Sequence, residues 1–133
     1  MTDGSRMPHP FADLLGFSVS ASGDGRCCVE LQLDARHMNP HGIVHGGVLY
    51  SVADTGMGGA LTSVLGADEI CTTVEIKIVY FRPAIAGTLT CNTEVINRGR
   101  RTAALESTLE AEGRLLARAY GTFMVLPRPG TTD

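Results

Sequence analysis

The sequence predicts an α+β fold in which a curved antiparallel sheet wraps around one long central helix, with a short helix near the N-terminus. The first observation behind this prediction is a single long helical segment, from about Gly46 to Leu65, that is rich in small apolar residues. The second is that two strand-like segments precede this helix and four follow it, with no other long helix among them. A sheet and a lone helix bury their apolar faces together when the sheet packs around the helix.

Length and composition bound the functional class. A chain of 133 residues is expected to form one domain, 1–133, with an ordered core from about residue 8 to residue 126. A net charge of −3 gives no reason to expect nucleic acid or an anionic membrane as a partner. The polar N-terminus lacks the apolar core of a secretory signal, and the four cysteines, which lack zinc-site spacing, are expected to be buried free thiols. We therefore expect a soluble, cytoplasmic protein with no metal and no cofactor of its own.

Turn-forming residues divide the part of the chain that precedes the central helix. A short helix is expected over residues 8–15, with Phe11, Leu14 and Leu15 on one side. Two strands and a loop are then expected at 17–21, 26–33 and 37–44, the strands being joined by a turn at 22–25. In the second strand one face is shared by Cys27, Val29, Leu31 and Leu33.

The part of the chain that follows the central helix alternates apolar and polar residues. Four strands are expected, at 73–80, 88–97, 102–111 and 115–126. In the first of them one face is shared by Val74, Ile76, Ile78 and Tyr80. Glu112-Gly113 predicts a tight hairpin between the last two strands, and we expect the four strands to form an antiparallel meander.

The central helix carries one carboxylate, Asp54, in an otherwise apolar segment. The small apolar face expected to pack on the sheet is formed by Val48, Leu49, Val52, Gly56, Gly59, Ala60 and Ser63. Asp54 lies on the opposite side, where its helical neighbours are Gly47, Ser51, Gly58 and Leu61. A lone acid in an apolar helix is costly unless it has a use, so this face is expected to meet a ligand or a partner. The alternative is a solvated or hydrogen-bonded structural acid.

The helix is expected to begin at Gly46-Gly47, whose backbone N–H groups would be free to bind a negative oxygen. An anion-binding terminus combined with one acid is typical of acyl transfer, with the acid activating water. Gly46 and Asp54 lie about 12 Å apart along a helix, so one helix cannot place both about 3 Å from the same carbonyl. Two copies related by a two-fold axis can, and the sequence therefore predicts a dimer with its active site across the interface.

These residues also carry a family resemblance. The matching motifs are Asn39, His45-Gly46-Gly47, Asp54, Tyr80-Phe81-Arg82-Pro83-Ala84, Gly99-Arg100 and Gly121-Thr122-Phe123. From about Phe11 to Leu126 the chain resembles the PaaI-like, phenylacetate-pathway type of hotdog-fold acyl-CoA thioesterase. The resemblance implies hydrolysis of a small aromatic or a short- to medium-chain acyl-CoA. It also implies a dimer as the minimal active unit and a homotetramer built as a dimer of dimers.

The resemblance implies a role for each site residue. Asp54 would be the general base or the nucleophile, and the Gly46 N–H would be the oxyanion donor. Asn39 would hold the attacking water or the thioester carbonyl, and His45 would orient the loop or that carbonyl. Thr73 would lie beside the acid, with Thr72 as the alternative.

Further residues are expected to bind the substrate. They are Gly47, Thr72, Met57, Leu61 and Arg82, and an acyl pocket would draw on Phe11, Leu14, Leu15, Met57, Leu61 and Met124. CoA phosphates would meet arginines near strand ends, which are Arg82, Arg98, Arg100 and Arg101.

Other functions remain as alternatives. A hotdog-fold acyl-thioester hydratase or dehydratase would act on the same carrier, and a non-catalytic acyl-CoA binding module would keep the pocket without needing Asp54. A metal site at His37, His41 and His45 is disfavoured, because Pro40 and Gly42 interrupt the helix that their spacing requires. The sequence contains no Gly-x-Ser-x-Gly elbow and no dinucleotide fingerprint.

Overall fold

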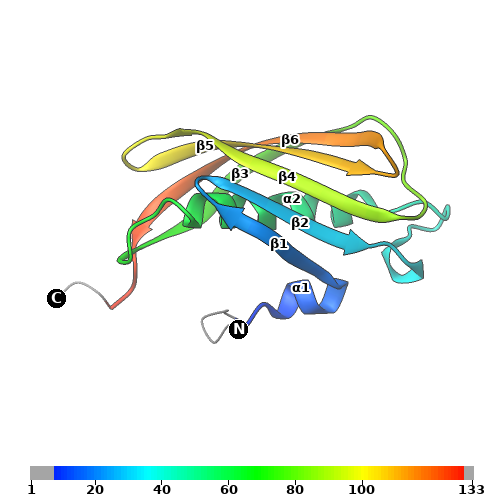
Figure 1. Cartoon of the computed structure of the whole chain (residues 1–133), viewed down its shortest axis with the longest axis horizontal. Coiled ribbons are helices and arrows are strands. Elements are labelled where there is room, and N and C mark those ends of the chain that lie inside the picture. Colours follow the sequence, from blue (N-terminus) through cyan, green and yellow to red (C-terminus); the bar gives the residue numbers. More distant parts are fainter. Residues whose placement is uncertain (1–7, 131–133) are drawn as a thin grey trace.

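A computed structural model describes residues 8–130, in which a six-stranded antiparallel sheet curves around one long helix (Figure 1). The elements, in chain order, are α1 (Pro10–Leu15), β1 (Phe17–Gly23), β2 (Arg26–Gln32), a 3₁₀ turn (Ala35–His37), α2 (Gly46–Thr62), β3 (Glu69–Tyr80), β4 (Thr88–Arg98), β5 (Thr102–Ala111) and β6 (Arg114–Pro127). This arrangement confirms the predicted fold class. None of the helices in residues 8–130 combines the length and the apolar character needed to cross a membrane.

The order of strands in the sheet is β1-β2-β4-β5-β6-β3. The predicted meander is therefore correct for β4, β5 and β6 but wrong for β3, which pairs with β6. Both edges of β4 are occupied, by β2 and by β5, so β3 cannot pair with β4 and instead lies at the outer edge of β6. As a result β1 and β3 are the two edge strands, and both border the side of α2 that the sheet leaves open (Figure 1).

Helix α2 is held against the sheet by its small residues. An added Cβ at Gly56 would lie 2.6 Å from Thr93 Oγ1 of β4, and one at Gly59 would lie 2.7 Å from Cys27 Sγ of β2. No real Cβ tolerates such distances, so these glycines permit the close approach that the sequence predicted. The helix ends at Thr62 rather than Leu65, because the N–H groups of Val64 and Leu65 bond back by only three residues, as in a 3₁₀ turn.

Two hairpins are built on residues with positive φ. Asp24 and Gly25 have φ values of 53° and 77°, and Glu112 and Gly113 have values of 52° and 74°. Paired positive φ angles are typical of the two-residue turns that match the twist of a sheet. The hairpin predicted at Glu112-Gly113 is confirmed, while the first turn is shorter than predicted because β1 continues to Gly23.

Helix α1 differs from the prediction in its start and its buried side. It begins at Pro10 rather than at residue 8, with His9 as its N-cap. Phe11 and Leu14 are 49% and 67% exposed, and Ala12 is the buried residue. Of the three apolar residues expected on one side, only Leu15 is partly buried against the core, because so short a helix makes few contacts with the sheet, mainly with β1.

Strand β3 contains a β-bulge at Val74. Thr73 pairs with Phe123 and Glu75 with Thr122, so Val74 has no partner in the ladder and is 55% exposed. The predicted common face of Val74 and Ile76 is therefore wrong. Because one extra residue reverses the alternation, the residues before the bulge and those after it are out of phase. Thr73 consequently points toward α2.

The cysteines are free thiols, as predicted, but only two of the four are buried. Burial raises the pKa of Cys27 and of Cys91 to about 11. Cys28 and Cys71 are half-buried, because Cys28 is on the outward face of β2 and Cys71 is on the edge strand β3. The prediction of burial is thus wrong for these two.

Candidate active site

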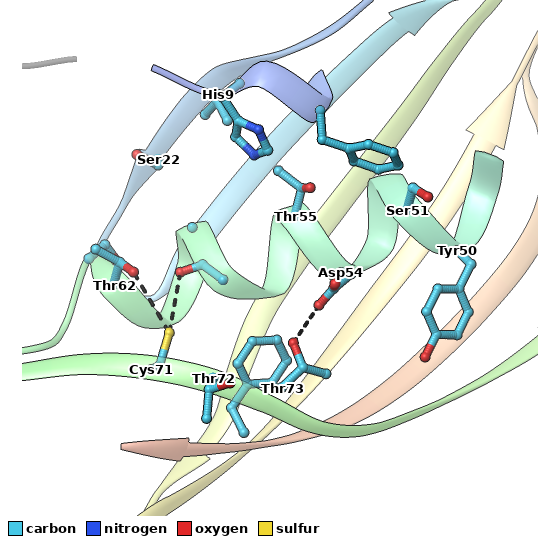
Figure 2. A pocket seen from close by; sticks show the side chains of 16 residues that line it. His9, Ser22, Tyr50, Ser51, Asp54, Thr55, Thr62, Cys71, Thr72 and Thr73 are labelled. Carbon is cyan, nitrogen blue, oxygen red and sulfur yellow. Dashed lines mark hydrogen bonds between the residues drawn. The ribbon is translucent and has the colours of Figure 1, made fainter. Parts of the chain in front are cut away.

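The carboxylate of Asp54 is oriented by a threonine of β3. Asp54 is half-buried on the open side of α2, and Thr73 Oγ1 donates a 2.7 Å hydrogen bond to its Oδ1 (Figure 2). The bulge at Val74 brings Thr73 to this position and leaves Thr72 in register with Met124. Of the two threonines considered from the sequence, Thr73 is therefore the one beside the acid. Within residues 8–130 this hydroxyl is the one hydrogen-bond partner of the carboxylate, and Asp54 also lines a cavity.

The cavity beside Asp54 is a groove of about 790 Å³ along the open side of α2. Figure 2 shows α2 crossing its middle, with His9 and Ser22 on one side and Cys71, Thr72 and Thr73 on the other. One wall is thus α1 with β1, and the other is the edge strand β3. The complete lining is His9, Phe11, Val19, Ser22, Tyr50, Ser51, Asp54, Thr55, Gly58, Gly59, Thr62, Ser63, Cys71, Thr72, Thr73 and Phe123.

The N-terminus of α2 presents one backbone donor. His45 is the N-cap, and its Nδ1 accepts the Gly47 N–H at 2.8 Å. The Gly46 N–H makes no hydrogen bond within residues 8–130, while the Gly46 carbonyl accepts from the Tyr80 hydroxyl at 2.8 Å. A Cβ at Gly46 would lie 3.1 Å from the Tyr80 ring. The Gly46 N–H is therefore a free donor at the positive end of the helix dipole.

Asn39 lies beside this helix terminus and shapes the loop before it. Its side-chain carbonyl accepts from the N–H of His41 at 2.8 Å and of Ile43 at 3.3 Å. This leaves the side-chain NH₂ as the group that can face a ligand. Asn39, Gly46 and Arg82 line one cavity of about 350 Å³.

The predicted site residues therefore form two groups within one chain. Asp54 and Thr73 line the groove along α2, and Asn39, Gly46 and Arg82 line the second cavity. This separation agrees with the helix-length argument that one copy of the chain cannot place both groups on the same carbonyl.

Several predicted pocket residues lie elsewhere. Met57 and Leu61 are 0% exposed and belong to the core, because the sheet covers more of the circumference of α2 than the helical periodicity indicates. The Gly47 N–H donates to the His45 side chain and is therefore not available to bind substrate. Of the apolar residues expected in an acyl pocket, Phe11 lines the groove, whereas Leu14, Leu15 and Met124 do not.

The structure also adds groove residues that the sequence did not indicate. His9, Val19 and Ser22 reach it because β1 is the neighbouring edge strand, which no local pattern predicts. Cys71 contacts Thr62 Oγ1 at 3.9 Å, and burial raises the pKa of its thiol, with the Asp54 charge adding to the rise. A neutral thiol is a poor nucleophile, so Cys71 is a wall of the groove.

His37 has a structural role. Its side chain is fully buried, with Nε2 2.7 Å from the Leu15 carbonyl and Nδ1 accepting the Asp34 N–H at 3.0 Å. It therefore joins the loop before α2 to the end of α1, as expected for a structural histidine.

Replacing Thr73 by Val is expected to lower the kcat of the reaction at Asp54 about 10-fold or more. A hydrogen bond to a charged group contributes about 1.5–3 kcal/mol, and this variant loses the one to the Asp54 carboxylate. Thr73→Ser, which keeps the hydroxyl, should restore most of the activity. Thr122→Val is the matched control, because it removes a threonine hydroxyl that donates to the Glu75 carboxylate outside both cavities, and steady-state kinetics of the three variants make the comparison. Equal losses at both positions would show that the Thr73 hydroxyl does not act through Asp54.

Comparisons with known proteins give the family of the chain. Residues 41–117 match the model of the Thioesterase superfamily. The protein PA0474 of Pseudomonas aeruginosa is 33% identical over 116 residues, which cover 86% of this chain and 87% of that protein. Acyl-coenzyme A thioesterase PaaI of Escherichia coli is 33% identical over 94 residues, which cover 68% of this chain and 64% of that protein. The solved structure of conserved protein PA5202 from Pseudomonas aeruginosa has a TM-score of 0.86 and 35% sequence identity. The similarity covers 90% of this chain and 96% of that one. The chain therefore belongs to the Thioesterase superfamily and is a hotdog-fold thioester hydrolase.

Proposed function

We propose that this protein hydrolyses an acyl-CoA thioester to the free acid and CoA, at an active site that two copies of the chain form together. The observation that carries the proposal is the pairing of an oriented acid, Asp54, with a free N–H, Gly46, that lie in separate cavities of one chain. The name of the PaaI relative supports CoA as the carrier. A small aromatic or a short- to medium-chain acyl group is the proposed substrate class.

The edge strand β3 supports assembly of the site from two copies. It runs over 12 residues and is unpaired on its outer side. Three apolar residues on it are strongly exposed, which are Val74 at 55%, Val79 at 40% and Tyr80 at 48%. Long apolar edges rarely remain uncovered in native proteins. Pairing of two β3 strands about a two-fold axis would bring the Gly46 of one copy toward the Asp54 of the other. A pair of such dimers is the tetramer proposed from the resemblance.

In the proposed reaction the thioester carbonyl accepts from the Gly46 N–H, where the helix dipole favours negative oxygen. Asp54 of the other copy removes a proton from water, and the resulting hydroxide attacks the carbonyl carbon. The tetrahedral intermediate collapses with cleavage of the C–S bond, and the CoA sulfur leaves and takes up a proton. In the second route Asp54 attacks directly to give an anhydride, which water then hydrolyses. One turnover in ¹⁸O-labelled water tests the second route, because water that attacks the Asp54 carbonyl carbon of the anhydride leaves its oxygen in Asp54, which the general-base route never does.

The surrounding residues have supporting roles in this proposal. The Asn39 side-chain NH₂, next to Gly46, holds the carbonyl or the water. His45 acts on the helix start by capping Gly47. Arg82 is the arginine beside Gly46 and is proposed to meet the CoA moiety. By contrast, Arg98 is paired with Glu69 at 3.1 Å, and Arg100 and Arg101 line a different surface hollow.

A free-thiol assay tests the reaction. Wild-type protein is incubated with phenylacetyl-, hydroxybenzoyl- and straight-chain acyl-CoA thioesters, and CoA release is followed. Release from at least one of them is expected. If no substrate releases thiol, the hydrolase proposal is wrong for this chain, and acyl-CoA affinity then tests the binding-module alternative.

Mixing two inactive variants tests the shared site. Asp54→Asn chains and Gly46→Pro chains, refolded together, should form mixed dimers in which one site keeps both wild-type groups. Because half of the dimers are mixed and each has one intact site, the mixture should recover about one quarter of wild-type activity. Each variant refolded alone is the control. A mixture that stays as inactive as its components would place both groups in one chain.

A further inference from the structure

Gly58 differs from the other glycines in the interior of α2. It lies one turn after Asp54 on the same side of the helix and lines the same groove. An added Cβ would have no neighbouring atom within 4 Å, whereas Cβ atoms at Gly56 and Gly59 would collide with Thr93 and Cys27. Packing within the chain thus explains two of these glycines and does not explain Gly58.

A glycine inside a helix is less favourable than alanine, so an unpacked glycine at this position needs another reason. The missing side chain leaves the surface of α2 bare over one turn beside Asp54. Phe11 and Val19 provide apolar surface on the α1–β1 wall of the same groove, and on the other wall the Cys71 Sγ lies 4.0 Å from the Gly58 carbonyl oxygen. On the N-terminal side of Asp54, the groove is instead lined by Tyr50 and Ser51. One turn after the acid, at Gly58, α2 therefore places no side chain in the groove.

We propose that Gly58 is the residue that sets the size of the acyl group. The acyl chain or ring lies against the bare turn at Gly58, between the α1–β1 wall and β3, while the thioester carbonyl is held near Asp54. The substrates are then acyl groups larger than acetyl. This inference rests on the proposed function. The competing explanation is that the second copy of the chain fills the space at Gly58.

Two substitutions at Gly58 test the inference. Gly58→Ala and Gly58→Leu place a small and a large side chain in the groove, the Cβ added at this position has no neighbouring atom within 4 Å, and both residues favour helix. Thiol release is measured for acetyl-, butanoyl-, hexanoyl-, octanoyl- and phenylacetyl-CoA. Gly58→Ala should lower kcat/KM about 10-fold or more for the largest accepted group relative to the smallest, and Gly58→Leu should lower it further. The Tm should not fall, and the oligomer should stay intact.

Gly56→Ala is the matched control, because its Cβ points at the buried Thr93 and Gly56 does not line the groove. It should lower the Tm while leaving the ratio of kcat/KM values between large and small acyl groups unchanged.

Three results would overturn the inference. One is an equal loss for all acyl groups in the Gly58 variants, and another is dissociation of the oligomer by Gly58→Ala, which would assign the space to the partner copy. The third is a wild-type enzyme that accepts acetyl alone. Affinities of Asp54→Asn protein for the same thioesters, with and without Gly58→Ala, separate this inference from the proposed function. If no thiol is released but large acyl groups bind less tightly in the Gly58→Ala protein, the role of Gly58 is kept and only the proposed hydrolysis fails. If Gly58→Ala does not change which acyl groups bind, the role of Gly58 is wrong.

Discussion

Replacing Asp54 by Asn is expected to lower kcat for thiol release by about a hundred- to ten-thousand-fold, the usual contribution of a general base. Asparagine has the same shape, and its carbonyl oxygen can still accept the hydrogen bond from Thr73. It can neither take a proton from water nor attack the thioester. The loss should therefore appear in kcat, with the circular dichroism spectrum and the gel-filtration profile of the wild type unchanged.

The control for this experiment is Asp24→Asn, which makes the same chemical change in the β1–β2 turn, outside the linings of both cavities. Asp24 has a φ of 53°, and asparagine tolerates this conformation. Its activity should equal that of the wild type. If Asp54→Asn and the wild type release thiol at equal rates, the protein is still a thioesterase but Asp54 is not its catalytic acid. A hydratase or dehydratase would instead change the acyl group without releasing CoA.

Replacing Gly46 by Pro is expected to lower kcat about a hundred- to a thousand-fold, as loss of an oxyanion donor does in other hydrolases. Proline deletes the Gly46 N–H and leaves the rest of the helix start in place. It is favoured at the first position of a helix, which Gly46 occupies. It also requires an extended residue before it, and His45 already has φ −62° and ψ 133°.

Gly46→Ala is the matched variant for this prediction. Both substitutions add a Cβ at 3.1 Å from the Tyr80 ring, which is half-exposed and can shift, but only proline lacks the N–H. Alanine should therefore keep most of the activity that proline removes. If both variants lose activity equally, crowding at Tyr80 and not the missing donor is the cause, and the oxyanion role of Gly46 is wrong.

Much of the fold could be predicted from local patterns. The hairpin at Glu112-Gly113, the inward face of β2 and the start of α2 depend on residues close together in the sequence, where periodicity and turn chemistry act directly. Asp54 and the glycine pair that begins α2 could be recognised for the same reason. Boundaries were less accurate at α1 and at the end of α2, since capping side chains and tightened last turns set them.

The position of β3 at the far edge of the sheet could not be read from alternation, because a regular strand pattern does not specify its neighbour. That position makes β1 and β3 the walls of the groove and brings His9 and Cys71 into it. In the same way, the sequence could indicate a hydroxyl beside the acid but could not choose between Thr72 and Thr73. The bulge at Val74 makes that choice, because it shifts the phase of β3 by one residue. Local sequence thus determined the elements and the chemistry of the acid, whereas strand order and register, which depend on contacts between distant residues, determined what surrounds it.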